Sequence, residues 1–160
     1  MIRLQELSPD DWKLWRELRL AALTEAPYAF NSNIADWEAA PEQRWRQRLS
    51  TPATCHVAAI LDDTPVGVAA GFPTDEENVA KLMSIWVAPS ARGRGVADEL
   101  ITAVGDWART TGASILELHV LVGNGSAHDL YLRNGFVDFH EADDTRPNDS
   151  KPEVVMRKQL

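Results

Sequence analysis

The segment Val87–Ala97, with the sequence VAPSARGRGVA, connects an apolar run to an amphipathic run through two glycines flanked by arginines. Glycine allows a tight turn and a close approach of the backbone to a ligand, so that several N–H groups point to one place. If a helix begins at Gly95, its first N–H groups and its dipole favour negative charge, to which Arg92 and Arg94 add countercharge. The segment therefore predicts a binding site for an anion such as a diphosphate.

Two better-known glycine motifs do not fit this segment. A dinucleotide-binding fingerprint needs a third glycine at position 98, where this chain has Asp98, and it occurs in an early strand-turn-helix unit. A P-loop needs Gly-Lys followed by Ser or Thr, which the segment lacks. Taken alone, the segment is also compatible with an arginine-glycine surface turn that binds nothing. Other parts of the sequence are needed to distinguish this turn from an anion site.

A second motif lies downstream, at Asn124–Phe136, with the sequence NGSAHDLYLRNGF. This motif, the pattern V-x-P-x-x-R-G-x-G-x-A of Val87–Ala97 and the preceding apolar run Ser84–Val87 together resemble the Gcn5-related N-acetyltransferases. In that family the glycine segment is the acyl-CoA pyrophosphate loop, and the second motif has the form N-x-x-A-x-x-L-Y-x-x-x-G-F. The resemblance implies an acetyltransferase with acetyl-CoA as co-substrate, without a metal ion, and a homodimer is common in the family.

The resemblance also assigns roles to residues at matching positions. The pyrophosphate is expected on the turn from Arg92 to Asp98, and the extended pantetheine arm is expected to pair with the backbone of the preceding strand. Asn124 matches an asparagine that contacts the cofactor, although it has an alternative role as the cap of the next helix, unless Ser126 caps that helix. The expected cofactor-binding residues are Ile85, Trp86, Val87, Arg92, Gly93, Arg94, Gly95, Val96, Ala97, Asp98 and Asn124.

Two residues are candidates for proton transfer. Tyr131 matches the general-acid tyrosine of the family, and a phenol with a reference pKa of about 10 can donate to a thiolate of similar basicity. His119 lies where some family members have a catalytic glutamate, and a reference pKa of about 6.5 suits a base near neutral pH. Aromatic packing is the alternative for Tyr131, and a buried histidine bonded to the backbone is the alternative for His119. Glu117 is a weaker candidate for the base, and an amine of low pKa needs no strong base.

Length and charge limit the possible functions. The chain has 160 residues, 44% of them hydrophobic, without a break in composition, which predicts one domain over residues 1–160. Its 24 acidic and 16 basic residues give a net charge of −8, which argues against nucleic acid as a partner. The same charge mildly favours a small cationic amine as the acceptor, although it also serves solubility. The acceptor itself and the length of the acyl chain are not readable from these motifs.

Compartment and membrane association can also be addressed. No apolar run approaches the roughly 18 residues that cross a bilayer, and the first residues lack the layout of a secretion signal. Cys55 is the only cysteine and lies in an apolar run, so we expect a core residue and no disulfide. These observations predict a cytoplasmic protein that does not associate with membranes.

Hydrophobic periodicity predicts an α/β (α+β) fold with a central mixed sheet of six to seven strands. Ile2–Leu7 alternates as a strand, and Ser8 with Pro9 begins a helix that runs to about Thr24. The other predicted elements are, in order, a helix at about Pro41–Leu49, strands at Thr54–Leu61, Val66–Phe72 and Val79–Val87, a helix from Gly95 to Gly112, a strand at Ser114–Leu121, a short helix that reaches Arg133, and strands at Phe136–Glu141 and Glu153–Arg157.

Three further predictions concern how these elements are arranged. Asp62–Pro65 reads as a hairpin turn, and the strand-helix-strand link makes Val79–Val87 and Ser114–Leu121 parallel. Within Val79–Val87, simple alternation puts Leu82, Ser84 and Trp86 on one face and Met83, Ile85 and Val87 on the other. In the family that the chain resembles, the first helices and the loop between them border the acceptor site. The resemblance therefore makes three aromatic residues candidates for the acceptor pocket, although ordinary packing explains them equally well: Tyr28, Phe30 and Trp37.

A function of a different class also remains open. The same fold without catalysis would be an acyl-CoA-binding sensor or interaction module. The joint presence of Tyr131, Asn124 and an ionisable His119 favours the enzyme.

Overall fold

The computed structural model describes residues 1–26, 34–141 and 153–160. In chain order its elements are β1 (Ile2–Glu6), a 3₁₀ turn (Pro9–Asp11), α1 (Trp12–Glu25), α2 (Ile34–Glu38), α3 (Glu42–Leu49), β2 (Cys55–Leu61), β3 (Thr64–Pro73), β4 (Val79–Val87), a second 3₁₀ turn (Pro89–Ala91), α4 (Val96–Thr110), β5 (Ile115–Leu121), α5 (Gly125–Arg133), β6 (Val137–Glu141) and β7 (Glu153–Gln159). The predicted α/β fold with a mixed sheet is confirmed.

The strands of the described residues form one seven-stranded sheet in the order β1-β2-β3-β4-β5-β7-β6. β4 and β5 are parallel, as predicted, and the other neighbours are antiparallel. The β4–β5 pairing is short, because only Val79–Lys81 pair with Ile115–Glu117. β7 lies between β5 and β6, which the sequence did not predict. The sheet therefore opens between β4 and β5 after three residue pairs.

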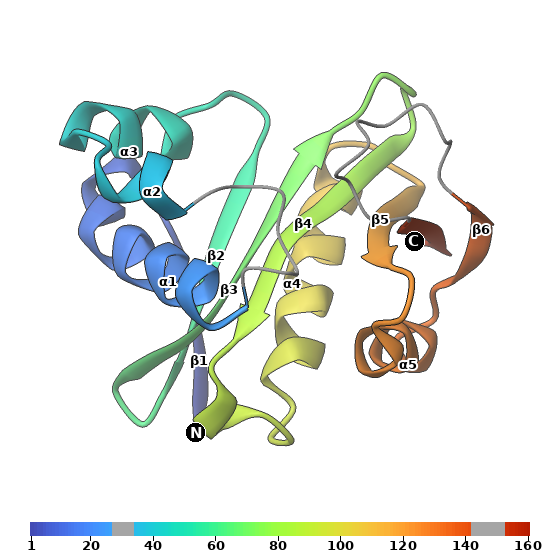
Figure 1. Ribbon diagram of the computed structural model, residues 1–160. Coiled ribbons are helices and arrows are strands. Elements are labelled where there is room, and N and C mark those ends of the chain that lie inside the picture. The colour runs from blue at the N-terminus through green and yellow to red at the C-terminus, as the bar shows by residue number, and fades with distance from the viewer. Residues whose placement is uncertain (27–33, 142–152) are drawn as a thin grey trace.

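Helices pack on both faces of the sheet (Figure 1). On one face α4 buries Leu100, Ile101 and Val104 against the strands. On the other face α1, α2 and α3 bury a cluster of three tryptophans, Trp15, Trp37 and Trp45. Neighbouring residues of β2, Val57 and Ala58, belong to the two different clusters, so the core has two layers separated by the sheet.

The predicted alternation of side chains along β4 was wrong. Ser84 has a positive φ of 58°, and the register shows Val68 opposite Trp86 but Ala70 opposite Met83. One residue of β3 thus faces two of β4, which is a β-bulge, and a bulge shifts the alternation by one residue. The shift places Leu82, Ile85 and Val87 on the α4 side and Trp86 on the α1 side.

The structure has the predicted hairpin turn and the predicted end of α4, and it adds one short helix that was not predicted. The hairpin turn between β2 and β3 is confirmed, with positive φ at Asp62 and Asp63, and Gly112 with a φ of 91° follows the end of α4. The short helix α2 was not predicted, because five residues are too few to show a helical period.

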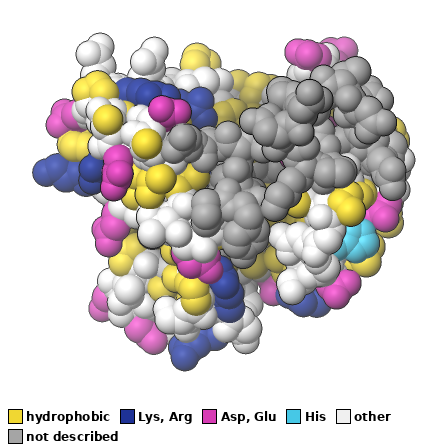
Figure 2. Space-filling view, in the orientation of Figure 1, with side chains coloured by type: hydrophobic (Ala, Val, Ile, Leu, Met, Phe, Trp, Pro, Cys, Tyr) yellow, Lys and Arg dark blue, Asp and Glu magenta, His cyan; other side chains and the backbone are white. Residues whose placement is uncertain are grey.

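Several basic side chains lie close together on the helical layer. Figure 2 shows Lys and Arg side chains over α3 with acidic side chains beside them, and further basic and acidic side chains scattered over the rest of this face. Arg44, Arg46 and Arg48 belong to α3. Within the described residues, no helix has both the length and the apolar character needed to cross a bilayer.

Candidate functional site

A cavity of about 840 Å³ lies between the end of β4, the first turn of α4 and α5. Every residue predicted to bind the cofactor lines it except Arg94, and Tyr131 lines it as well. The cavity is also lined by six residues that the sequence analysis did not propose as site residues: Ala26, Ala91, Ser126, Ala127, Leu130 and Arg133. The spacing of Ala127 and Tyr131, one helical turn apart, was the available signal for the α5 wall.

The glycine segment builds one end of this cavity. Gly93 and Gly95 have positive φ angles of 79° and 82°, and a Cβ at either position meets nothing within 4 Å. Glycine is therefore required there for backbone conformation and not for space. Gly95 caps α4 without a side-chain hydrogen bond, and the amides of residues 93–97 donate to no acceptor among the described residues. These free N–H groups and the helix dipole make an anion site.

Arg92 is held on the side of this cradle that faces α1. Its Nη2 donates to Oε1 of Glu25 over 2.6 Å, and its Nε donates to the carbonyl oxygen of Val87 over 3.1 Å. The second oxygen of Glu25 accepts from Nε1 of Trp86 over 3.3 Å. The last residue of α1 thus links the glycine segment to the end of β4.

The carboxylate of Asp98 is turned toward the end of α5. It accepts from Nδ2 of Asn134 over 2.8 Å and from Nη2 of Arg133 over 3.1 and 3.2 Å. The hydrogen bond from Asn134 is the largest effect and lowers the pKa of Asp98; burial opposes it, and the hydrogen bond and charge of Arg133 lower the pKa further. The charge of Asp98 is therefore paired within the protein, as is that of Arg133.

Tyr131 lies on α5 and lines the cavity while it packs in the core. Its residue exposure is only 7%, and its ring meets Phe136 edge to face at 5.9 Å. Burial raises the pKa of Tyr131 to about 12. Among the described residues, no group forms a hydrogen bond with its hydroxyl. The phenol is therefore protonated at neutral pH and not committed to another acceptor, which are two properties of a general acid.

Asn124 caps α5, and the prediction that Ser126 does so was wrong. Oδ1 of Asn124 accepts from the amide of Ala127 over 3.3 Å, while Ser126 lies inside the first turn. The helix begins one residue earlier than Ser126 because an asparagine side chain at the N-cap reaches the third amide well. Asn124 therefore both orders α5 and lines the cavity.

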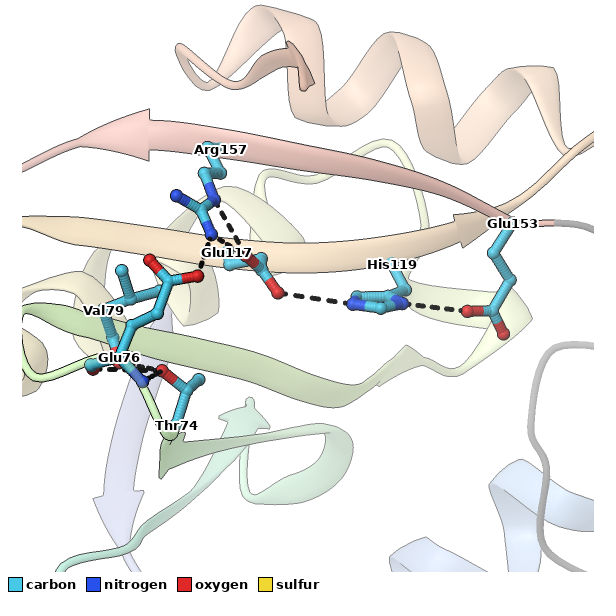
Figure 3. A network of polar contacts seen from close by, with 7 residues as sticks. All are labelled: Thr74, Glu76, Val79, Glu117, His119, Glu153 and Arg157. Carbon is cyan, nitrogen blue, oxygen red and sulfur yellow. Dashed lines mark hydrogen bonds and ion pairs between the residues drawn. The ribbon is translucent and has the colours of Figure 1, made fainter. Parts of the chain in front are cut away.

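His119 lies on β5 in a chain of polar contacts (Figure 3). Its Nδ1 is 3.0 Å from Oε2 of Glu153 on β7, and its Nε2 is 3.4 Å from Oε1 of Glu117. Arg157 binds the other oxygen of Glu117 at 2.7 Å and also binds Oε1 of Glu76 at 2.8 Å. A single line of charges thus runs from Glu153 to Glu76 across one face of the sheet.

His119 does not line the cavity that contains Tyr131. The neighbouring β5 residues Leu118 and Val120 point into the α4 core, so His119 lies on the opposite face of the strand. The pairing of β4 with β5 ends at Lys81 and Glu117, so His119 lies in the part of β5 that no longer pairs with β4. Tyr131 lies on α5, which follows β5 in the chain.

Of the three candidates for the acceptor pocket, only Trp37 lies within the described residues. Tyr28 and Phe30 lie outside the described residues. Trp37 is buried against Trp45 at 4.8 Å and carries the guanidinium of Arg44 over its ring at 4.5 Å. Trp37 lines neither that cavity nor the shallow groove beside α4.

Cys55 and the potential metal ligands form no further site among the described residues. Cys55 is buried, as predicted, and burial raises its pKa to about 11. Among the described residues, no group of three or more His, Cys, Asp or Glu side chains is placed to hold a metal ion.

Comparison with known proteins identifies the family of this chain. Residues 12–136 match the model of the acetyltransferase (GNAT) family, which is most of the chain. The protein therefore belongs to the GNAT acetyltransferase family. The motif resemblance that rested on the glycine segment and Asn124–Phe136 is thereby confirmed.

Individual relatives are more distant. N-acetylaspartate synthetase of Rattus norvegicus is 31% identical over 108 residues, which are 68% of this chain and 34% of that protein. Aminoglycoside N(6′)-acetyltransferase type 1 of Klebsiella aerogenes is 32% identical over 100 residues, 56% of this chain and 66% of that protein. The chain thus spans about a third of the length of the first relative.

A solved structure shows the same fold at low identity. The PaiA N-acetyltransferase of Thermoplasma acidophilum, crystallised in complex with coenzyme A, superposes with a TM-score of 0.75 at 18% identity. The superposition covers all of this chain and 99% of that one.

Proposed function

We propose that the protein is an N-acetyltransferase that moves an acetyl group from acetyl-CoA to a primary amine by direct attack of the amine. The observation that carries the proposal is one cavity that combines free amides at residues 93–97 with Tyr131 in its wall. The first feature suits the diphosphate of the donor, and the second suits its leaving sulfur. Membership of the family supports the reaction class.

The donor site fits coenzyme A in two respects. The amides of residues 93–97 would hold the pyrophosphate, since Gly93 and residues 95–97 line the cavity and these amides donate to no acceptor among the described residues. Among the strands that the structure describes, none pairs with β4 on the β5 side beyond Lys81, so the backbone at Ile85–Val87 can pair with the amide-rich pantetheine arm. Arg92 contributes charge at longer range, because Glu25 and Val87 hold its guanidinium.

Three groups of the chain would carry out the proton and charge transfers. Tyr131 donates a proton to the departing sulfur, an N–H of β4 stabilises negative charge on the carbonyl oxygen, and His119 accepts a proton from the amine. The amine would approach from the face of β5 that bears His119 and would reach the carbonyl carbon between β4 and β5. This placement needs the unpaired stretch between the two strands.

The acceptor is proposed to be a small cationic amine. The net charge of −8 and the carboxylates beside His119 support this class. The relatives do not narrow it, because their names refer to an amino acid in one case and an aminoglycoside in another.

The test is release of the free thiol from acetyl-CoA in the presence of a panel of amines, amino acids and aminoglycosides. We expect release only when an acceptor amine is present. Tight binding of coenzyme A, measured by calorimetry, without turnover on any amine would instead support a non-catalytic acyl-CoA-binding module.

A further inference from the structure

We propose that Glu153 is a positioning residue that fixes the orientation and tautomer of His119, so that Nε2 of His119 is the atom that accepts the proton of the amine. The proposal rests on the proposed function, because it assigns a role within that reaction. It concerns a contact between β5 and β7 that the catalytic motifs do not contain.

The two distances at the imidazole distinguish its two carboxylate neighbours. The distance from Nδ1 to Oε2 of Glu153 is 3.0 Å, which is within the usual range for an N–H···O hydrogen bond. The distance from Nε2 to Oε1 of Glu117 is 3.4 Å, which is beyond that range. The hydrogen-bond network therefore assigns the proton of the neutral ring to Nδ1 and the lone pair to Nε2.

The charge of Glu117 is directed away from His119 by Arg157. The guanidinium donates through Nε over 2.8 Å and lies 2.7 Å away through Nη2, both times at Oε2 of Glu117. Arg157 is in turn held by Glu76 and by the ring of Phe139, which is 4.0 Å from the guanidinium carbon. Glu117 is thus paired with a cation, and Glu153 is the carboxylate that acts on the imidazole.

Burial allows Glu153 to act in this way. Its side chain is 13% exposed and that of His119 is 29% exposed, so water screens the contact less than it screens a surface pair. When the ring gains a proton from the amine, Glu153 stabilises the positive charge that forms. A carboxylate that orients a catalytic histidine by its Nδ1–H acts in the same manner in serine proteases. The titratable and charged groups of the described residues around His119 are Glu117, Glu153, Arg157 and, through Arg157, Glu76.

The first experiment is a double-mutant cycle with Glu153→Gln and His119→Ala. Glu153→Gln should lower kcat about 10-fold to 100-fold, a part of the effect that general-base catalysis supplies, and leave the KM for acetyl-CoA unchanged. In the His119→Ala background it should have no further effect, because Glu153 acts through His119. If the double variant shows the product of the two separate reductions in kcat, or if Glu153→Gln keeps full activity, the proposal is overturned.

Glu76→Gln is the matched control for the loss of one negative charge. Glu76 contacts Arg157 at the far end of the same chain of contacts, and its side chain is 60% exposed. We expect its kcat to lie within twofold of the wild type. Glu153→Asp keeps the charge but shortens the side chain, and it should restore part of the activity that Glu153→Gln loses. Thermal unfolding of all variants shows whether each is folded.

A second measurement does not depend on turnover. The ¹⁵N chemical shifts of the His119 ring, recorded where the ring is neutral, report which nitrogen bears the proton. We expect the Nδ1–H tautomer in the wild type and a gain of Nε2–H in Glu153→Gln. A wild-type ring protonated at Nε2, or a ring that Glu153→Gln does not change, would refute the proposal. Absence of turnover with every amine in the wild type would contradict the proposed function and leave this result in force.

Discussion

Replacement of Tyr131 by phenylalanine removes one oxygen atom from the cavity wall and leaves the ring in place. The hydroxyl has no hydrogen-bond partner among the described residues, so its removal leaves no orphaned group in the protein. The free energy of unfolding should therefore change by less than about 1 kcal/mol. The ring keeps its contact with Phe136, and the affinity for coenzyme A should remain within twofold.

The expected loss is in the chemical step. General-acid catalysis contributes about 10²-fold or more, so kcat should fall at least 100-fold, which corresponds to about 2.7 kcal/mol in the activation barrier. Steady-state thiol release measures kcat, and calorimetric titration with coenzyme A measures binding. Tyr131→Ala is the control for packing, and it should lower the stability by about 3–5 kcal/mol as a buried aromatic truncation. A kcat of Tyr131→Phe within twofold of the wild type would exclude Tyr131 as the acid.

The raised pKa of Tyr131 adds a check in alkali. The unfolded phenol ionises near its ordinary pKa of 10.0, whereas the folded phenol keeps its proton up to about 12. Between pH 10 and about 12 the unfolded state thus binds fewer protons than the folded state. The contribution of Tyr131 to the free energy of unfolding is therefore complete below pH 10 and is lost as the pH rises toward 12. The loss amounts to roughly 2–3 kcal/mol. Urea unfolding at pH 9 and pH 11 should show the wild type losing more stability than Tyr131→Phe, and equal losses would contradict the assigned burial effect.

Two other predictions follow from the fold. Gly95→Ala forces a side chain into a φ of 82°, which costs about 1–2 kcal/mol. This substitution should weaken coenzyme A binding at least about fivefold, as measured by calorimetry. Gly125→Ala is the control, because Gly125 lies in a helix without a positive φ, and it should not weaken the binding. Burial, and then the charge of Arg48, lower the pKa of His56 from 6.5 to about 4. Neutral His56 therefore contributes roughly 3 kcal/mol to the free energy of unfolding, a contribution that is complete above pH 6.5 and is lost as the pH falls toward 4. His56→Phe should therefore lose less stability than the wild type between pH 7 and pH 4 in urea unfolding, and equal losses would contradict this assignment.

The parts of the fold that were predicted depend on local sequence. The helix from Gly95 to Gly112 has its start, its period and its end within one segment, and the structure reproduces them as Val96–Thr110. The parallel pairing of β4 and β5 followed from a general rule about crossover connections. The insertion of β7 between β5 and β6 has no local signal, because it depends on which strand edge is free when the last strand is added.

The faces of β4 were predicted wrongly for a similar reason. A bulge at Ser84 depends on how β3 and β4 align, and Ser84 itself is an ordinary residue for a strand. The apolar residues on both sides of it fit either alternation, so the sequence had no means to distinguish them.

In the candidate site, the residues that are contiguous in the sequence were predicted, and the contacts between distant residues were not. The cavity wall from Arg92 to Asp98 is continuous in the sequence and was therefore predictable, except that Arg94 does not line it. The partners of these residues are distant: Glu25 is 67 positions from Arg92, and Glu153 is 34 positions from His119. Such contacts arise from tertiary packing and need the structure.

The short pairing between β4 and β5 has a mechanical consequence. The closed end is held by the pairs at Val79–Lys81 and by the hydrogen bonds that join Asn78 to Ser114, so a rotation of one half of the sheet against the other would have its pivot there. From Lys81 to Val87 β4 extends about 20 Å, at about 3.3 Å per residue, and a rotation of about 5° at the pivot moves its far end by about 1.7 Å. That displacement is about one carbon–carbon bond. Substitutions at the pivot, far from the thioester, should therefore change which acyl length fits between the strands.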